Sequence, residues 1–326
     1  MSAGDQEKAQ TGFDLAALGE TMALFVTEPA SPLRQAHTFV RSIAGAESNV
    51  AIGVARLGLK SAWCGRVGGD ALGLAVLDRL RAEGVDISRA IVDDDSWTGV
   101  LVRDRHHEQR INVAYARRGS AGSALRLADV DADWVASARV LHVTGITPAL
   151  SATAAGAVER ALELAHTAGV EVSFDVNLRR RLWADDEAAR VLRSLVLRVN
   201  ILFATEAELA VLSGSPDVRS GAEWALESGV RTVVVMRGAL GAVAFDHDGT
   251  VEAEAHRVSP VDPVGAGDAF VAGYLAAALA GEAPSACLQQ GCRTGAAAVQ
   301  VPGDIEGLPW GSGGLFDCAE GLDVDR

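Results

Sequence analysis

A short glycine turn followed by an acidic residue is the part of this sequence best suited to chemistry. It reads Gly265-Ala266-Gly267-Asp268, and it leads into an alanine- and leucine-rich run, 269–280, with no proline before Pro284. This pattern predicts a tight loop that opens a helix. The unpaired N–H groups of a first helical turn favour an anion, and glycines let the backbone approach a phosphate closely. The Asp268 carboxylate could then take a proton from a hydroxyl group that attacks phosphorus.

The same turn has a purely structural interpretation, in which Asp268 is an ordinary N-cap residue after a glycine turn. The rest of the chain has to decide between the two. Neither of two other phosphate-binding patterns is present: there is no Gly-x-x-x-x-Gly-Lys-Ser/Thr string, and no Gly-x-Gly-x-x-Gly follows the first predicted strand. A phosphate ligand would therefore depend on the turn before Asp268.

Two further segments offer polar groups to a ligand. In 44–51 a glycine turn and a polar trio precede a helical pattern, so Asn49 and the backbone could bind substrate hydroxyls or could simply cap the helix. The loop 175–183 carries three consecutive arginines after an apolar strand, at the edge where open α/β sheets bind ligands. Those arginines could equally balance the acidic residues 185–187.

Charge and cysteine usage exclude several classes of function. The chain has 29 basic and 43 acidic residues, a formal net charge of −14, and its basic residues are spread along the sequence. We therefore expect no nucleic-acid partner and no anionic membrane surface as partner. Only two residues are lysines, so arginines must bind any anionic substrate. The four cysteines lack metal-type spacing and no long apolar run occurs, which predicts a cytoplasmic protein with reduced thiols.

The remaining pattern predicts the elements that must position these residues. Apolar strands alternate with amphipathic helices, as in a parallel sheet covered by helices. Strands are expected at 13–18, 36–43, 62–67, 140–143, 170–174, 201–204, 232–236 and 242–245, and helices at 71–83, 151–168 and 187–198. A hairpin of 98–102 with 111–115 interrupts the rhythm and suits a lid. We expect one α/β domain over 12–312, lid strands inserted at about 33–43 and 97–118, and loosely ordered tails 1–11 and 313–326.

Taken together, these motifs resemble those of the PfkB/ribokinase family of carbohydrate kinases, over roughly residues 13–310. The resemblance is carried by Gly45-Ala46-Glu47-Ser48-Asn49-Val50-Ala51, by 65–70, and by the stretch from Asp262 to Phe270. Within the family the chain is most similar to 2-keto-3-deoxygluconate kinases. The strings that carry this closer similarity are Tyr115-Ala116-Arg117, 119–121, 142–146, 173–179 with Leu182-Trp183, and 303–309.

The resemblance implies a ribokinase-like α/β fold, with a mostly parallel central sheet flanked by helices and a small β lid. It implies ATP-dependent phosphorylation of the C6 hydroxyl of 2-keto-3-deoxygluconate or a similar sugar acid, with Mg²⁺. The implied catalytic groups are Asp268 as base and the N–H groups of Gly265, Ala266 and Gly267 as anion hole. The implied substrate-binding residues are Gly45, Ala46, Asn49, Tyr115, Arg117 and Arg179. The nucleotide would meet Thr205, Gly238, Gly241 and Gly267, and Glu208 would organise the metal through water.

Three positions differ from the family pattern. Thr205 stands where such kinases usually have asparagine, Leu101 where they can have a tyrosine, and Met236 where a lysine is frequent. Two alternatives therefore stay open: a fructokinase- or ribokinase-type enzyme for a neutral sugar or nucleoside, and a non-catalytic sugar-binding regulator. Val100, Val102, Ile111 and Val113 give the hairpin an apolar face, through which two copies of the chain could pair as a homo-oligomer.

Overall fold

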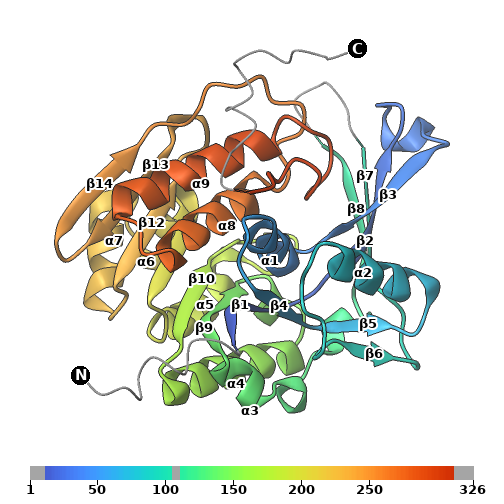
Figure 1. Cartoon of the computed structure of the whole chain (residues 1–326), viewed down its shortest axis with the longest axis horizontal. Helices are drawn as coiled ribbons and strands as arrows, with labels where there is room; N and C mark the ends of the chain where they lie inside the picture. The colour runs from blue at the N-terminus through green and yellow to red at the C-terminus, as the bar shows by residue number, and fades with distance from the viewer. Residues whose placement is uncertain (1–11, 105–110, 312–326) are drawn as a thin grey trace.

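A computed structural model describes residues 12–104 and 111–311 of the chain (Figure 1). The predicted loose tails, 1–11 and 313–326, and Cys318 lie outside the described residues. Within the described part, the main sheet has eight strands in the order β14-β13-β12-β11-β10-β9-β1-β4. Their bounds are β1 (Phe13–Leu18), β4 (Ser61–Cys64), β9 (Ala138–Thr144), β10 (Glu171–Asp175), β11 (Ile201–Thr205), β12 (Thr232–Met236), β13 (Ala242–Asp246) and β14 (Gly249–Ala253). All neighbours pair in parallel except β12 with β13 and β13 with β14.

Helices cover both faces of this sheet, which is why its inner strands are apolar at successive positions. In β12, Val233 and Val235 pack into the core on one face, whereas Val234 packs into the core on the other. The first face is covered by α3 (Ala132–Ala136), α4 (Ala152–Ala168), α5 (Asp185–Val196), α6 (Glu206–Ser213) and α7 (Val218–Glu227). The second is covered by α1 (Ala46–Arg56), α2 (Ala71–Ala82), α8 (Ala266–Leu279) and α9 (Pro284–Ala298).

A separate four-stranded sheet projects from the main body, and we call it the lid sheet (Figure 1). Its order is β3 (Phe39–Ala44), β2 (Met22–Thr27), β7 (Val100–Arg103) and β8 (Val113–Ala116). The predicted hairpin is confirmed, because β7 and β8 pair antiparallel. The lid sheet also uses β2, which follows β1 after only three residues, and it has a small core of its own that includes Leu24 and Leu101.

The single strand predicted at 62–67 is wrong, because the chain changes sheets at Gly65. β4 ends at Cys64, and β5 (Arg66–Gly68) pairs with β6 (Ile91–Asp93) in a small third sheet. A Cβ atom at Gly65 would lie 2.2 Å from the Gly19 carbonyl oxygen, so this crossing requires glycine. Apolar residues occur on both sides of Gly65, so the sequence pattern gives no sign that the strand ends there.

Several elements were not predicted, and α9 is the one that matters for the site. Its interior contains Gly291 and Gly295, which lower intrinsic helix propensity, yet it packs along α8 and is largely buried there. Tertiary packing outweighs the local signal in this segment. No described helix is long and apolar enough to span a lipid bilayer.

Close packing of α1 against α8 brings the first turns of these helices together. A Cβ atom at Gly53 of α1 would lie 2.5 Å from the Cβ of Ala272 in α8, so only glycine permits this approach. As a result, Asn49 in the first turn of α1 donates a hydrogen bond to Asp268 in the first turn of α8. The two segments that the sequence singled out thus meet in space.

Candidate functional site

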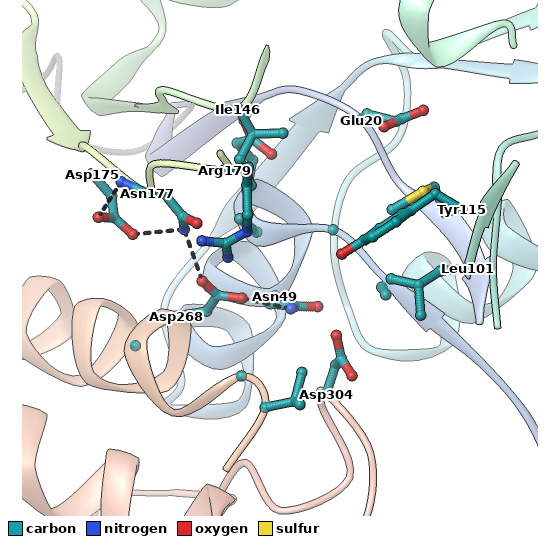
Figure 2. A pocket seen from close by; sticks show the side chains of 18 of the residues that line it. Glu20, Asn49, Leu101, Tyr115, Ile146, Asp175, Asn177, Arg179, Asp268 and Asp304 are labelled. Atoms are coloured by element: carbon teal, nitrogen blue, oxygen red, sulfur yellow. Dashed lines mark hydrogen bonds between the residues drawn. The ribbon is translucent and has the colours of Figure 1, made fainter. Parts of the chain in front are cut away.

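A cavity of about 210 Å³ lies between the lid sheet and the carboxyl ends of the main-sheet strands (Figure 2). Every predicted sugar-binding residue lines it, and so do most of the other predicted site residues. From the prediction these are Gly45, Ala46, Asn49, Tyr115, Arg117, Arg179, Thr205, Glu208, Gly265, Gly267 and Asp268. Leu101 and Met236, two positions that differ from the family pattern, line it as well. We call this space the sugar cavity.

The glycine turn opens a helix, as predicted. Gly265 is the N-cap residue with φ 80°, and α8 begins at Ala266. A Cβ atom at Gly265 would meet the Asp304 carbonyl oxygen at 2.5 Å, so both the left-handed backbone and the tight contact require glycine. The first turn of α8 therefore points its N–H groups and the positive end of its dipole toward the cavity.

Asp268 is not an N-cap residue, since Gly265 occupies that position and the carboxylate bonds elsewhere. Its side chain is buried, with 9% of the residue exposed, and it accepts hydrogen bonds from Asn49 Nδ2 at 2.7 Å and Asn177 Nδ2 at 3.4 Å. Burial raises the pKa of Asp268, while Asn49, Arg179 and Asn177 act in the opposite direction. A buried carboxylate with a raised pKa, held by two amides, is suited to accept a proton.

A second acidic group lies beside Asp268 at the ends of β10 and β11. Asp175 holds Asn177 through its side-chain amide at 2.9 Å, and Asn177 has the positive φ of 41° that turns this loop toward the cavity. Burial, together with the charges of Glu208 and Asp268, raises the pKa of Asp175 well above its usual range. Asp175 and Asn177 lie in the motif 173–179, but the sequence indicates no role for either residue.

Thr205 and Glu208 form the capping box that their spacing indicates. The Thr205 hydroxyl accepts from the Glu208 N–H, and the Glu208 carboxylate accepts from the Thr205 N–H at 2.8 Å. Glu208 also accepts from the Leu178 N–H at 2.7 Å, which ties the helix to the loop that carries Arg179. Both oxygens of the Glu208 carboxylate therefore bond to the protein.

The lid side of the cavity is formed by Tyr115 and Arg117, and a residue that the sequence did not indicate holds Arg117. Arg117 Nε donates to Glu20 Oε2 at 2.8 Å, and its Nη2 bonds to the same oxygen. Burial raises the pKa of Glu20, while the Arg117 charge opposes that effect. Glu20 is a single acidic residue after an apolar strand, so only the folded chain reveals its partner.

Two further acidic residues of the cavity were also missed. Asp304 lines the cavity, and burial raises its pKa to about 7, with the charges of Asp268 and Asp262 adding to the rise. Glu47 is 1% exposed and accepts from the hydroxyls of Thr144 and Thr147 at 2.7 and 2.6 Å; burial raises its pKa to about 7. Glu47 lies in the motif 45–51 and Asp304 in the motif 303–309. Apart from membership of these motifs, the sequence gives no indication of their roles.

A second cavity of about 490 Å³ adjoins the first, and we call it the nucleotide cavity. Met236 and Gly267 line both spaces. The predicted residues Gly238, Gly241, Gly267 and Ala266 line the nucleotide cavity, whereas Thr205 lines only the sugar cavity. Small and apolar residues form most of its remaining wall, including Ala255, Val258, Cys292, Gly295, Ala296 and Val299. The α9 residues in this list were missed because α9 itself was not predicted.

This geometry suits transfer of a group from a ligand in one cavity to a ligand in the other. Asp268 and the first turn of α8 stand where the two cavities meet, since Gly267 belongs to both walls. A base and an anion-binding helix end at such a junction are the parts that phosphoryl transfer to a hydroxyl requires.

Comparison with known proteins also indicates a kinase. The model of the pfkB family carbohydrate kinases matches residues 13–311. The chain is 38% identical to the 2-dehydro-3-deoxygluconokinase of Bacillus subtilis strain 168, over 91% of this chain and 92% of that one. It is 35% identical to a fructokinase of Salmonella typhimurium, over 82% and 88% of the two chains.

The fold has close counterparts among solved structures. A putative ribokinase II from E. coli, in complex with ATP and Mg²⁺, has a TM-score of 0.86 and 26% identity, covering 91% of this chain and 96% of that one. The expected ribokinase-like fold is therefore confirmed. With the family match spanning both cavities and the Asp268 turn between them, the chain belongs to the pfkB family of carbohydrate kinases and is a phosphotransferase that acts on a sugar hydroxyl.

Proposed function

We propose that the enzyme uses ATP to phosphorylate the C6 hydroxyl of 2-keto-3-deoxygluconate, also called 2-dehydro-3-deoxygluconate, or of a similar sugar acid. The observation that carries this proposal is the presence of two arginines, Arg117 and Arg179, in the wall of the cavity that holds Asp268. The 2-dehydro-3-deoxygluconokinase relative supports the same substrate class.

The two arginines differ in how much charge they offer to a sugar acid. Arg117 is already paired with Glu20, so it presents its remaining N–H groups rather than a full unpaired charge. Arg179 forms no close ion pair in the described part of the chain, and its charge acts on the nearby carboxylates of Asp268 and Asp175. A guanidinium fork matches a carboxylate in shape and charge, which favours an acid over a neutral sugar.

Asp268 accepts the proton of the attacking hydroxyl, and the N–H groups of Gly265, Ala266 and Gly267 stabilise charge on the transferred phosphoryl group. Asn49 and Asn177 hold the carboxylate in place from two sides. Positioning by these fixed groups, rather than covalent chemistry, provides most of the acceleration.

The acidic residues of the cavity fit a magnesium ion that is held mainly by phosphates and water. No described group of three or more His, Cys, Asp or Glu residues forms a dedicated metal cage, and Mg²⁺ in kinases needs only one or two carboxylates. Glu208 would organise its water shell, with Asp175 close by. When bound, the ion would neutralise charge on the phosphate oxygens.

The nucleotide cavity suits the adenosine part of ATP. Most of its wall consists of small or apolar side chains and of the backbone around Gly238 and Gly241, and His256 and Arg257 line it as well. We infer that shape and backbone contacts hold the adenosine part there.

A neutral-sugar kinase is the second candidate, because a fructokinase is among the relatives. Leu101, which lines the sugar cavity where the resemblance implies that such kinases can have a tyrosine, leaves the choice of sugar open. Three smaller expectations also stay predictions: a cytoplasmic location, no nucleic-acid or membrane partner, and pairing of two copies through the half-buried lid residues Val100, Val102 and Val113.

A panel of sugars in a coupled assay of ADP release tests the proposal. We expect the highest kcat/KM for 2-keto-3-deoxygluconate, about tenfold or more above fructose, ribose and a nucleoside, because only the acid engages both arginines. A preference for fructose would establish the neutral-sugar alternative. ADP release that no sugar stimulates would favour a non-catalytic regulator.

A further inference from the structure

A buried arginine at the end of a lid strand bridges the lid sheet to the two loops beside the phosphate turn. Arg103 is the last residue of β7, and 1% of it is exposed. Its Nη2 lies 2.6 Å from Asp262 Oδ2 and 3.2 Å from Asp304 Oδ1. The lid and the main body are thus joined by an ion pair that solvent does not reach.

Both aspartates contact the turn that precedes α8, Asp262 through its carboxylate and Asp304 through its backbone. Asp262 accepts from the N–H of Val264 at 3.2 Å and from that of Gly303 at 3.1 Å, so it ties the start of the turn to the loop that carries Asp304. The Asp304 carbonyl oxygen, in turn, packs against Gly265. A movement of either aspartate would therefore move the N–H groups of the anion hole.

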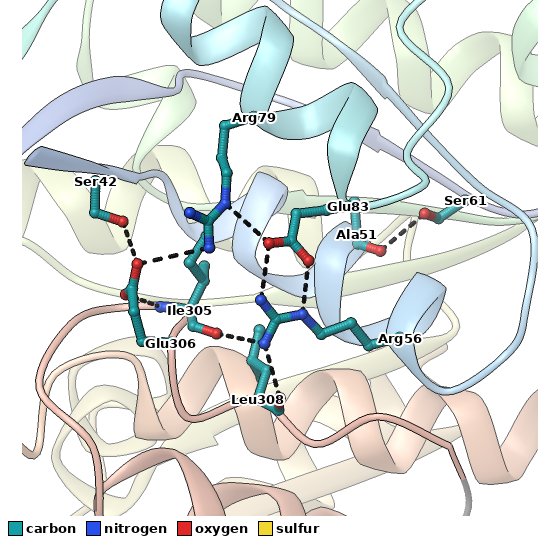
Figure 3. A network of polar contacts seen from close by, with 9 residues as sticks. All are labelled: Ser42, Ala51, Arg56, Ser61, Arg79, Glu83, Ile305, Glu306 and Leu308. Carbon is teal, nitrogen blue, oxygen red and sulfur yellow. Dashed lines mark hydrogen bonds and ion pairs between the residues drawn. The ribbon is translucent and has the colours of Figure 1, made fainter.

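The loop that carries Asp304 has a second anchor, and this one belongs to the main body (Figure 3). Arg56 of α1 donates from Nη1 to the carbonyl oxygens of Ile305 and Leu308, each at 2.8 Å, and its Nε bonds to Glu83 at 2.7 Å. Because α1 and α2 pack on the main sheet, this anchor stays in place when the lid moves. Two contacts of this loop depend on the position of the lid: the Ser42 hydroxyl of β3, which donates to Glu306 at 2.5 Å, and the buried ion pair of Arg103. Of the two, only Arg103 brings a charge to the aspartates beside the phosphate turn.

We propose that Arg103 is a positioning residue that couples closure of the lid sheet to the shape of the anion hole and to the orientation of Asp304 in the sugar cavity. This inference rests on the kinase activity proposed above, although not on which sugar is used. With the lid in the position seen here, the guanidinium neutralises two buried carboxylates that would otherwise face each other.

The contact is also suited to open and close. Arg103 Nε and Nη1 are buried and have no hydrogen-bond partner among the described residues. An ion pair whose remaining N–H groups are unsatisfied gains less from burial than a fully bonded one does. We call the ion pair of Arg103 with Asp262 and Asp304 the latch. It holds the lid sheet in place but can break, which release of a product requires.

The structure provides a matched control in Arg66. Like Arg103, it is buried, it bridges two carboxylates, Asp93 at 2.7 Å and Asp129 at 3.0 Å, and its Nε has no partner in the described residues. Unlike Arg103, it begins β5 in the small third sheet, and neither of its carboxylate partners lines a cavity, whereas Asp304, a partner of Arg103, lines the sugar cavity. Removing Arg66 measures what loss of a buried ion pair does by itself.

The test compares Arg103→Met, Arg103→Lys and Arg66→Met, each with the sugar that the panel shows to be turned over best. For each variant we would measure kcat for transfer, the rate of ATP hydrolysis without sugar, and nucleotide affinity with and without sugar. Misplacement of the anion hole in Arg103→Met should lower kcat about tenfold or more, raise the ratio of hydrolysis to transfer, and abolish the effect of sugar on nucleotide affinity. Arg103→Lys should recover part of each value.

Arg66→Met should lower thermal stability and leave the hydrolysis ratio and the sugar effect unchanged. The latch is disproved if Arg103→Met, or Arg103→Lys should the first variant not fold, keeps the wild-type ratio and sugar effect. It is also disproved if Arg66→Met changes both to the same extent. If no sugar stimulates ADP release even in the wild-type enzyme, the proposed function fails first, and that result is visible before any variant is made.

Discussion

The two cavities recognise their ligands by different means. Charged side chains from segments far apart in the sequence line the sugar cavity, among them Glu20, Arg117, Arg179, Asp268 and Asp304. Small residues and glycine backbone line most of the nucleotide cavity. Side-chain charge can discriminate between similar sugars, whereas shape and backbone contacts discriminate mainly by size. We therefore expect substitutions in the sugar cavity to change KM for the sugar, and substitutions in the nucleotide cavity to change KM for ATP.

Asp268 stands where the cavities meet, and its replacement should give the largest effect. In Asp268→Asn the base is lost while the amide keeps the size of the side chain, so kcat should fall about 10²-fold or more. Nucleotide affinity, measured by calorimetry with ADP, should change little. Near-normal turnover would mean that another group accepts the proton.

Arg117→Ala tests the sugar side of the comparison. Loss of its charge-assisted hydrogen bonds should raise KM for a sugar acid by about 10- to 100-fold, and KM for a neutral ketose far less. KM for ATP should stay close to the wild-type value. Equal changes for acid and neutral sugars would argue that Arg117 serves the lid rather than the substrate.

Ala296→Phe tests the nucleotide side. Ala296 lies on α9 in the cavity wall and is 8% exposed, so a phenyl ring there would fill space meant for the base. We expect KM for ATP to rise about tenfold with KM for sugar unchanged. A change in KM for sugar alone, measured at saturating ATP, would show that the cavities are not separate.

Glu47→Gln should give the smallest effect, visible in the pH dependence of stability. The pKa of Glu47 rises from 4.5 to about 7 in the folded protein, so its contribution to stability is present below pH 4.5 and is lost as the pH rises toward 7. The full effect is on the order of 3 kcal/mol at most. The variant should lose less thermal stability than wild type between pH 5 and pH 8, and parallel melting curves would contradict the burial argument.

The sequence predicts the contiguous phosphate turn better than the isolated acidic residues of the sugar cavity. The turn at 265–268 is contiguous, so glycine spacing and the following helix reveal it at once. The isolated acidic residues are Glu20, Glu47 and Asp304. They come together only when the end of β1, α1 and the loop 299–311 pack side by side in the folded chain, and a local sequence pattern cannot predict such long-range contacts. The main strands follow from their apolar runs, but α9 does not, because burial against α8 stabilises a segment with two interior glycines.

Three of the points where the chain enters or leaves the lid sheet lie in the wall of the sugar cavity. β1 leads into β2 through Glu20, β3 leads into α1 through Gly45, and β8 leaves the lid sheet at Arg117. The lid sheet is therefore not a cassette that can be exchanged between relatives to move a sugar preference with it. A chimaera joined at these crossings would cut through the recognition site itself, so transplanted specificity must include the crossings and the loop of Asp304 from the same parent.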